Sequence, residues 1–122
     1  MVLSCRAPEP TIRHSEGVPA VFNDEPLPAR IQGVLRRVLG AARVQLAKPE
    51  TVSEDFGLFG QAGVPLLMFR LGSVDGPRLE RYRQLGQSPP SLHSAAYYPD
   101  AEATLSTGIV AMASAVLDLL PP

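Results

Sequence analysis

The feature that most constrains the fold of this chain is a nearly unbroken apolar run, VPLLMFRLG, at residues 64–72. The run shows no alternation of polar and apolar side chains, and Pro65 and Gly72 bound it. Such runs are typical of strands that are buried on both faces of a parallel sheet. Because helices cover the faces of a parallel sheet, we expect helical segments before and after this run.

Residues 23–40, NDEPLPARIQGVLRRVLG, carry the signals of a helix. We expect Asn23 or Asp24 to cap its N-terminus and Gly40 to stop it in a left-handed conformation. Helical spacing places five apolar residues on one face, which we expect to be buried: Leu27, Ile31, Val34, Leu35 and Val38. Three arginines project elsewhere and are expected to form a solvated face: Arg30, Arg36 and Arg37.

The C-terminal segment, DAEATLSTGIVAMASAVLDLLPP, predicts a second long helix that begins at Asp100 and stops at Pro121. Steps of three and four residues mark the stripe expected to pack against the core: Leu105, Ile109, Met112, Val116 and Leu119. Polar residues interrupt the apolar region 105–120, and it falls short of the roughly 20 apolar residues of a membrane span. We therefore expect a buried helix and no membrane partner.

The order of elements indicates an α/β layer in a single domain. Strands are predicted at residues 11–17, 43–47 and 64–72, and they alternate with the helices described above. A short helix is also expected after Gly76. The chain has 122 residues, of which 45% are hydrophobic, so it can form one core.

Charge and cysteine content exclude several classes of protein. The formal net charge is −1, with acidic and basic residues spread along the chain, so no basic surface for nucleic acid or anionic lipid is expected. Cys5 is the single cysteine, which excludes an internal disulfide and favours a reducing compartment. No apolar signal-peptide core is present near the N-terminus, so we expect a cytoplasmic protein.

The two histidines, His14 and His93, are the first candidates for chemistry. His93 lies in PPSLHSAAYYPD, a proline-bounded loop just before the last helix. A loop histidine can be an ordinary polar residue, a pH-sensitive group or a metal ligand. No HxxxH or HExxH spacing surrounds either histidine, so spacing alone favours an ordinary loop residue.

Glu54 and Asp55 are the second candidates. Neighbouring carboxylates in an apolar surrounding can act as general acid and base. However, Thr51 and Glu54 also form a capping-box pattern, and Asp55 suits a helix N-terminus, so spacing alone favours a capping role. Nothing in the sequence activates Cys5 as a nucleophile.

Four stretches taken in order resemble the C-terminal portion of the metal-dependent amidohydrolases that include hippurate hydrolase, aminoacylase and the indole-acetyl-amino-acid hydrolases. They are GVPAVFND, VSEDFGLFGQAGVPLLMFRLG, SLHS and the helix that begins near DAEATLSTGIVAM. The resemblance covers residues 11–120. Its most specific elements are SEDF, followed by VP and LG, and LHS before the last helix.

The resemblance implies a partial three-layer α/β sandwich, a mostly parallel sheet flanked by helices, as in a zinc-peptidase-like catalytic domain. Residues 1–17 would be the tail and last strand of a lid or dimerisation domain. Residues 18–122 would be the C-terminal part of the catalytic α/β domain. His93 would match a metal ligand, and Glu54 and Asp55 would line the active-site cleft.

That family binds two metal ions, usually zinc or manganese, and hydrolyses N-acyl amino acids through a metal-bridged hydroxide and a catalytic glutamate. The sequence lacks the other ligands and that glutamate, so the resemblance implies no catalytic residue here and an inactive isolated chain. It implies a segment of a truncated or split enzyme, with a missing N-terminal half as partner. In such a fragment the strand at Pro65 to Leu71 would expose its edges, so we expect a homo-oligomer, a dimer or larger species. The alternative is a non-catalytic α/β module for binding or oligomerisation.

Overall fold

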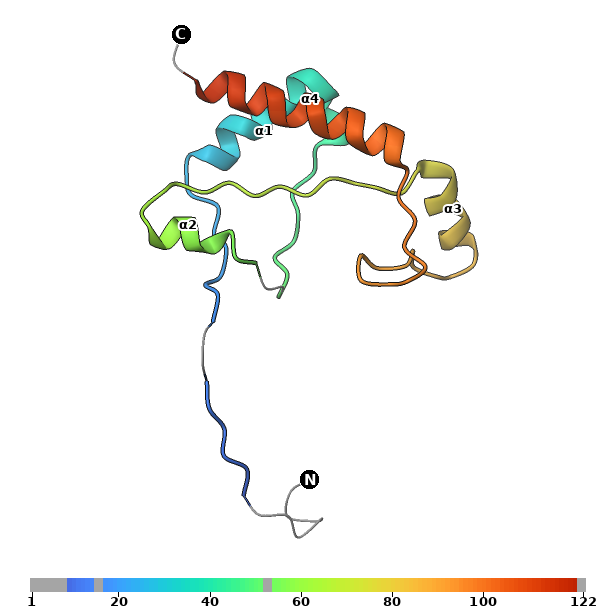
Figure 1. The fold of residues 1–122 in the computed structure, drawn as a ribbon. Helices are drawn as coiled ribbons and strands as arrows, with labels where there is room; N and C mark the ends of the chain where they lie inside the picture. Colours follow the sequence, from blue (N-terminus) through green and yellow to red (C-terminus); the bar gives the residue numbers. More distant parts are fainter. Residues whose placement is uncertain (1–8, 15–16, 52–53, 121–122) are drawn as a thin grey trace.

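The computed structural model describes residues 9–14, 17–51 and 54–120, and its regular structure is helical (Figure 1). The helices are α1 (Leu27–Leu39), the short 3₁₀ helix η2 (Ala41–Arg43), α2 (Gly57–Gln61), α3 (Gly76–Gln84) and α4 (Ala101–Leu119). Helices α1 and α4 pack against each other on one side of residues 64–72, and α2 lies on the other side (Figure 1).

The predicted α/β sandwich with a mostly parallel sheet is wrong, because the described part of the chain contains no β-strand. Residues 43–47 and 64–72, two of the predicted strands, form no ladder. Of the third, residues 11–14 and 17 have no regular structure, and residues 15–16 lie outside the described residues. A strand needs a second strand to accept its main-chain hydrogen bonds, and none is paired with residues 64–72 here.

Side chains take the place of a neighbouring strand along one edge of residues 64–72. The Leu66 N–H donates to Asp24 Oδ2 over 2.6 Å, and the Asp24 N–H donates to the Leu66 carbonyl over 2.8 Å. The Asn23 amide group exchanges two further bonds with Met68, of 2.7 and 3.0 Å. Asn23 and Asp24 therefore occupy this edge with three side-chain bonds and one main-chain bond.

This use of Asn23 and Asp24 corrects the predicted helix start. Helix α1 begins at Leu27 after Pro26, and no side chain caps it. The other end is confirmed: Gly40 follows Leu39 with φ of 91°, a conformation that glycine adopts without steric cost. The predicted apolar face is confirmed for Ile31, Val34 and Leu35, whereas Val38 is 47% exposed.

Helix α4 contacts α1 through its small residues. Ala111 and Ala115 are buried against Ile31, Val34 and Leu35, and together these five residues form the core. The prediction that the large apolar stripe would pack there is wrong: its residues, Leu105, Ile109, Met112, Val116 and Leu119, are all exposed. Small side chains let two helix axes approach closely, so the alanine face of α4 fits against the bulkier face of α1.

Arg30 and Asp118 join the two helices at the margin of this core. The Arg30 Nε lies 2.6 Å from Asp118 Oδ2, and Arg30 Nη2 also donates to the Asp118 main-chain carbonyl. Arg30 is exposed, as predicted, but its guanidinium also pairs with Asp118 across the two helices. Arg37 is exposed as well and approaches the same carboxylate, at 3.8 Å. Arg36 is exposed, as predicted.

The predicted N-terminal signal of α4 is confirmed. The Asp100 carboxylate accepts a bond from the Ala103 N–H at the start of α4, and Glu102 lies in the first turn. The expected helix after Gly76 is α3, which Asp75 caps through the Arg78 N–H over 2.7 Å. By length and composition α4 could also cross a membrane, a test that core helices of soluble proteins pass as well.

The chain exposes far more surface than a compact protein of its mass. Its accessible surface area is 10482 Å², whereas a compact 13.0 kDa monomer exposes roughly 6,300 Å². Residues 9–14 contribute to the difference, since they run away from the helices (Figure 1). The exposed apolar side of α4 contributes as well. Much apolar surface is thus left uncovered by the chain itself.

Candidate functional site

His93 lies in the loop between α3 and α4, and its side chain is exposed. The loop turns tightly around it: the Ser94 N–H donates to the Ser91 carbonyl over 3.0 Å, and the Tyr97 N–H donates to the Ser94 carbonyl over 3.0 Å. The Ser94 hydroxyl also accepts a bond from the Ala96 N–H over 3.2 Å. None of these three bonds involves the imidazole of His93, which is exposed.

Ser73 ties the C-terminal side of this loop to the end of the extended segment. The Tyr97 hydroxyl donates to Ser73 Oγ over 2.6 Å, and the Asp100 N–H donates to the Ser73 carbonyl over 2.7 Å. The loop is therefore positioned by Ser73, which directly follows residues 64–72. Leu67 and Phe69 of those residues pack against the core.

Arg78 on α3 supports the loop from a second direction. Its Nη2 donates to the Tyr98 carbonyl over 2.8 Å, and its guanidinium carbon lies 5.3 Å from the centre of the Tyr98 ring. The Arg78 Nε lies 2.8 Å from Asp75 Oδ2, an ion pair without the alignment of a hydrogen bond. Arg78 was not among the candidate residues in the sequence. The signal that could have revealed the cap beside it is the Asp-Gly-Pro start of α3.

Glu54 and Asp55 precede α2, and both are exposed. The capping-box interpretation of Thr51 and Glu54 is wrong, because α2 begins at Gly57, Phe56 occupies the cap position and no side chain caps the helix. Asp55 contributes through its main chain: its carbonyl accepts a bond from the Leu58 N–H over 2.9 Å. Neither carboxylate therefore caps α2, which is the role that spacing alone favoured.

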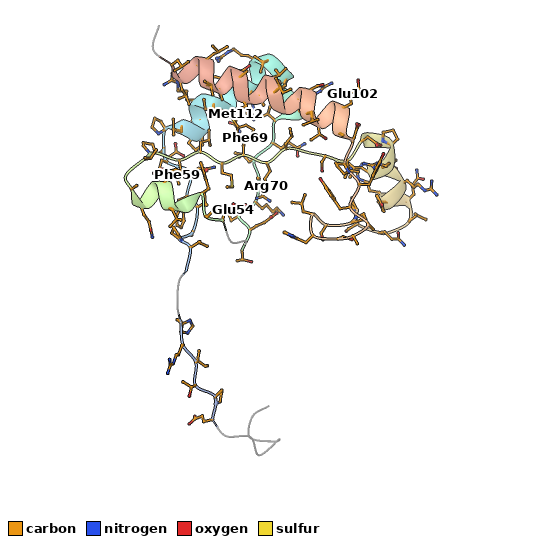
Figure 2. All side chains as sticks on the ribbon, viewed as in Figure 1. Glu54, Phe59, Phe69, Arg70, Glu102 and Met112 are labelled. Carbon is orange, nitrogen blue, oxygen red and sulfur yellow. The ribbon has the colours of Figure 1, made fainter. Side chains whose placement is uncertain are left out.

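Gly57 fixes where this short helix lies. It is buried, and a methyl group in place of its hydrogen would lie 2.9 Å from the Pro19 carbonyl oxygen. This close approach requires glycine. It holds the loop that carries Glu54 and Asp55 against residues 19–20. Figure 2 shows Glu54 below the extended segment.

The His93 loop and the Glu54 loop lie on the same side of residues 64–72, away from α1 and α4 (Figure 1). No hydrogen bond or ion pair among the described residues joins the histidine to either carboxylate. Nor does the described part of the chain bring three histidine, cysteine, aspartate or glutamate side chains together. His14 is exposed in the N-terminal segment, and Cys5 lies outside the described residues.

An apolar hollow borders the extended segment. It has a volume of about 190 Å³ and is lined by Phe56, Leu67, Met68, Phe69 and Met112. Figure 2 shows Met112 and Phe69 on the side of the segment that faces α4. The residues that line the hollow come from three separate parts of the chain, so spacing in the sequence gave no signal for it.

The chain is similar to a protein of Synechocystis sp. that is named as a probable hydrolase, with 31% identity over 105 residues. The match includes 85% of this chain and 24% of that protein, so the chain spans about a quarter of the length of the curated relative it matches. No family model and no solved structure matches the chain.

Proposed function

We propose that this chain is the C-terminal segment of a metal-dependent amidohydrolase whose complete form hydrolyses the amide bond of N-acyl amino acids. The observation that carries the proposal is the similarity to a quarter of a longer protein named as a hydrolase. The SEDF and LHS motifs lie within the segment that carries the resemblance, and they supply the finer assignment to amidohydrolases. The complete protein would be cytoplasmic and would bind zinc or manganese.

His93 is proposed as one metal ligand of the complete protein. A catalytic zinc site usually takes three protein ligands, and a dinuclear site needs more. The described residues offer no such group, so they do not fit a complete metal centre on their own. The exposed imidazole on a loop held by Ser73 and Arg78 suits a ligand whose companions come from another part of the polypeptide.

Glu54 and Asp55 are proposed to line the cleft of the complete protein. Both are exposed, and the loop that carries them lies on the same side of residues 64–72 as the His93 loop (Figure 1). Neither caps α2 with its side chain, which leaves their oxygens available to a substrate or to a neighbouring polypeptide.

Hydrolysis of benzoylglycine tests the proposal. We expect the purified chain to show no activity with or without added zinc or manganese, and less than about 0.1 zinc per chain, since structural zinc needs several deprotonated ligands. Activity that a chelator abolishes and a metal ion restores would show that the chain is complete by itself.

The positive arm uses the polypeptide encoded upstream of this chain in the same genome. We expect the two polypeptides together to hydrolyse benzoylglycine and His93→Ala to abolish this activity. His14→Ala is the matched control, since His14 is the other histidine of the chain and is also exposed. Equal activity of both variants would refute the role of His93.

A second candidate function is a non-catalytic module for binding or oligomerisation. The observation that favours it is the exposed apolar side of α4, which is unusual for a protein that acts alone. Failure of the upstream polypeptide to restore hydrolysis, together with stable association of the chain, would favour this function.

A further inference from the structure

The His93 loop, residues 89–99, is joined to the rest of the chain by hydrogen bonds near its C-terminal end. The Tyr97 hydroxyl donates to Ser73 Oγ over 2.6 Å, and Arg78 Nη2 donates to the Tyr98 carbonyl over 2.8 Å. In the part of the chain that the structure describes, no hydrogen bond joins the earlier residues of the loop to a residue outside it. The position of the loop therefore depends on its last residues.

Two consecutive turns connect Tyr97 to His93. The Tyr97 N–H donates to the Ser94 carbonyl over 3.0 Å, and the Ser94 N–H donates to the Ser91 carbonyl over 3.0 Å. His93 occupies the third position of the first turn, where the main-chain dihedral angles are restricted. Because Ser94 ends one turn and begins the next, a displacement of Tyr97 would be passed on to His93.

The side chain of Tyr97 is half-buried, whereas that of the next residue, Tyr98, is 76% exposed. Tyr97 lines a cavity of about 20 Å³ together with Arg78 of α3 and two prolines of the loop, Pro89 and Pro90. A cavity of this size has room for about one water molecule, so the loop packs closely around the ring. The ring and the hydroxyl of Tyr97 thus both contact the surroundings of the loop.

We propose that Tyr97 is a positioning residue of the candidate site, whose hydroxyl, bonded to Ser73, holds the imidazole of His93 in the orientation that the complete protein uses. This inference rests on the proposed function, because the orientation of His93 matters to a reaction only if this histidine acts in it. Tyr97 acts through the two turns and takes no part in the chemistry itself. A side chain that is already oriented loses less conformational freedom when its companions bind.

Backbone ¹⁵N relaxation of the purified chain tests the positioning without any hydrolase reaction. We expect order parameters of about 0.85 for the His93 and Ser94 amides in the unmodified chain, and below about 0.6 in Tyr97→Phe. The matched control is Tyr98→Phe, which removes the neighbouring hydroxyl, a group that makes no hydrogen bond between described residues. Unchanged order parameters in Tyr97→Phe, or an equal loss in Tyr98→Phe, would overturn the proposal.

Ser73→Ala tests the same hydrogen bond from its other partner. We expect it to lower the order parameters of the His93 loop as much as Tyr97→Phe does, and the double variant to lower them no further, because both substitutions remove one bond. Circular dichroism verifies that all variants keep their helices. A further loss of order in the double variant would show that Ser73 and Tyr97 act separately, and would overturn the proposal.

Kinetics with the polypeptide encoded upstream tests the consequence for the reaction. We expect Tyr97→Phe to lower kcat for benzoylglycine about tenfold with KM unchanged, as is typical when a group that orients an active-site residue is removed. Tyr98→Phe should change neither constant. An unchanged kcat in Tyr97→Phe would overturn the proposal. An inactive mixture of the unmodified polypeptides would instead refute the proposed hydrolase function, and the order parameters would still decide whether Tyr97 positions the loop.

Discussion

Arg30 of α1 and Asp118 of α4 are joined across 88 residues of sequence by an ion pair of 2.6 Å. Arg30 also donates to the Asp118 main-chain carbonyl in the last turn of α4, where a positive charge is favourable. The contact lies at the edge of the α1–α4 core and joins the first turn of α1 to the last turn of α4.

Arg30→Ala is expected to lower the free energy of unfolding by about 0.5–1 kcal/mol, since the pair is partly exposed and screened by solvent. Arg37→Ala should cost less, because Arg37 is 3.8 Å from the same carboxylate and more exposed. Urea denaturation followed by circular dichroism measures both. A larger loss of unfolding free energy for Arg37→Ala than for Arg30→Ala would contradict the assignment of Arg30 as the main partner of Asp118.

Ala111→Leu is expected to destabilise the protein by about 1–3 kcal/mol, because the added methyl groups would force α1 and α4 apart. Ala113→Leu, an exposed position on the same helix, should change stability by less than about 0.5 kcal/mol. The comparison uses thermal melts of the two variants. Similar melting temperatures would mean that the alanine face is not the packing face.

Gly57→Ala is expected to destabilise the start of α2 by about 1–3 kcal/mol, since its methyl group would approach the Pro19 carbonyl oxygen within 2.9 Å. Gly76→Ala is the control, as an added methyl group meets nothing within 4 Å there. It should be neutral or stabilise α3 by roughly 0.5–1 kcal/mol. Equal destabilisation by the two substitutions would rule out the close approach.

Asp24→Ala is expected to raise the hydrogen-exchange rate of the Leu66 amide, because that N–H would lose its 2.6 Å acceptor. The loss of stability should be about 1–3 kcal/mol, the cost of an unsatisfied buried donor. Glu25→Ala, at the next position and also exposed, should leave the exchange rate unchanged. An unchanged exchange rate of the Leu66 amide in Asp24→Ala would contradict the hydrogen bond from this amide to the Asp24 carboxylate.

Local signals in the sequence predicted the C-terminal end of α1 and the start of α4. Gly40 ends α1 and Asp100 begins α4, since both effects depend on the conformation or side chain of one residue. The prediction that the apolar run at residues 64–72 is a strand buried on both faces was wrong: no strand in the described part of the chain pairs with it, and within the run only Leu66 is buried. Strand pairing depends on residues far away in the sequence, and here two polar side chains, Asn23 and Asp24, take that place.

The face that α4 buries could not be deduced from its periodicity. Apolar residues surround this helix, so spacing favoured the large side chains, whereas α1 accommodates Ala111 and Ala115. For the candidate site, the sequence identified the loop of His93 but not its supports. The contacts of Arg78 and Ser73 with this loop join residues 20 to 27 positions apart, and no motif records them.

The two edges of residues 64–72 differ, and this difference limits how far the chain can aggregate. Amyloid-like growth needs a free row of main-chain groups on both sides of every added strand. Asn23 and Asp24 block one side with their own side chains, and Pro65 offers no N–H at the start of the other. Stacking into fibrils therefore has no second edge on which to continue.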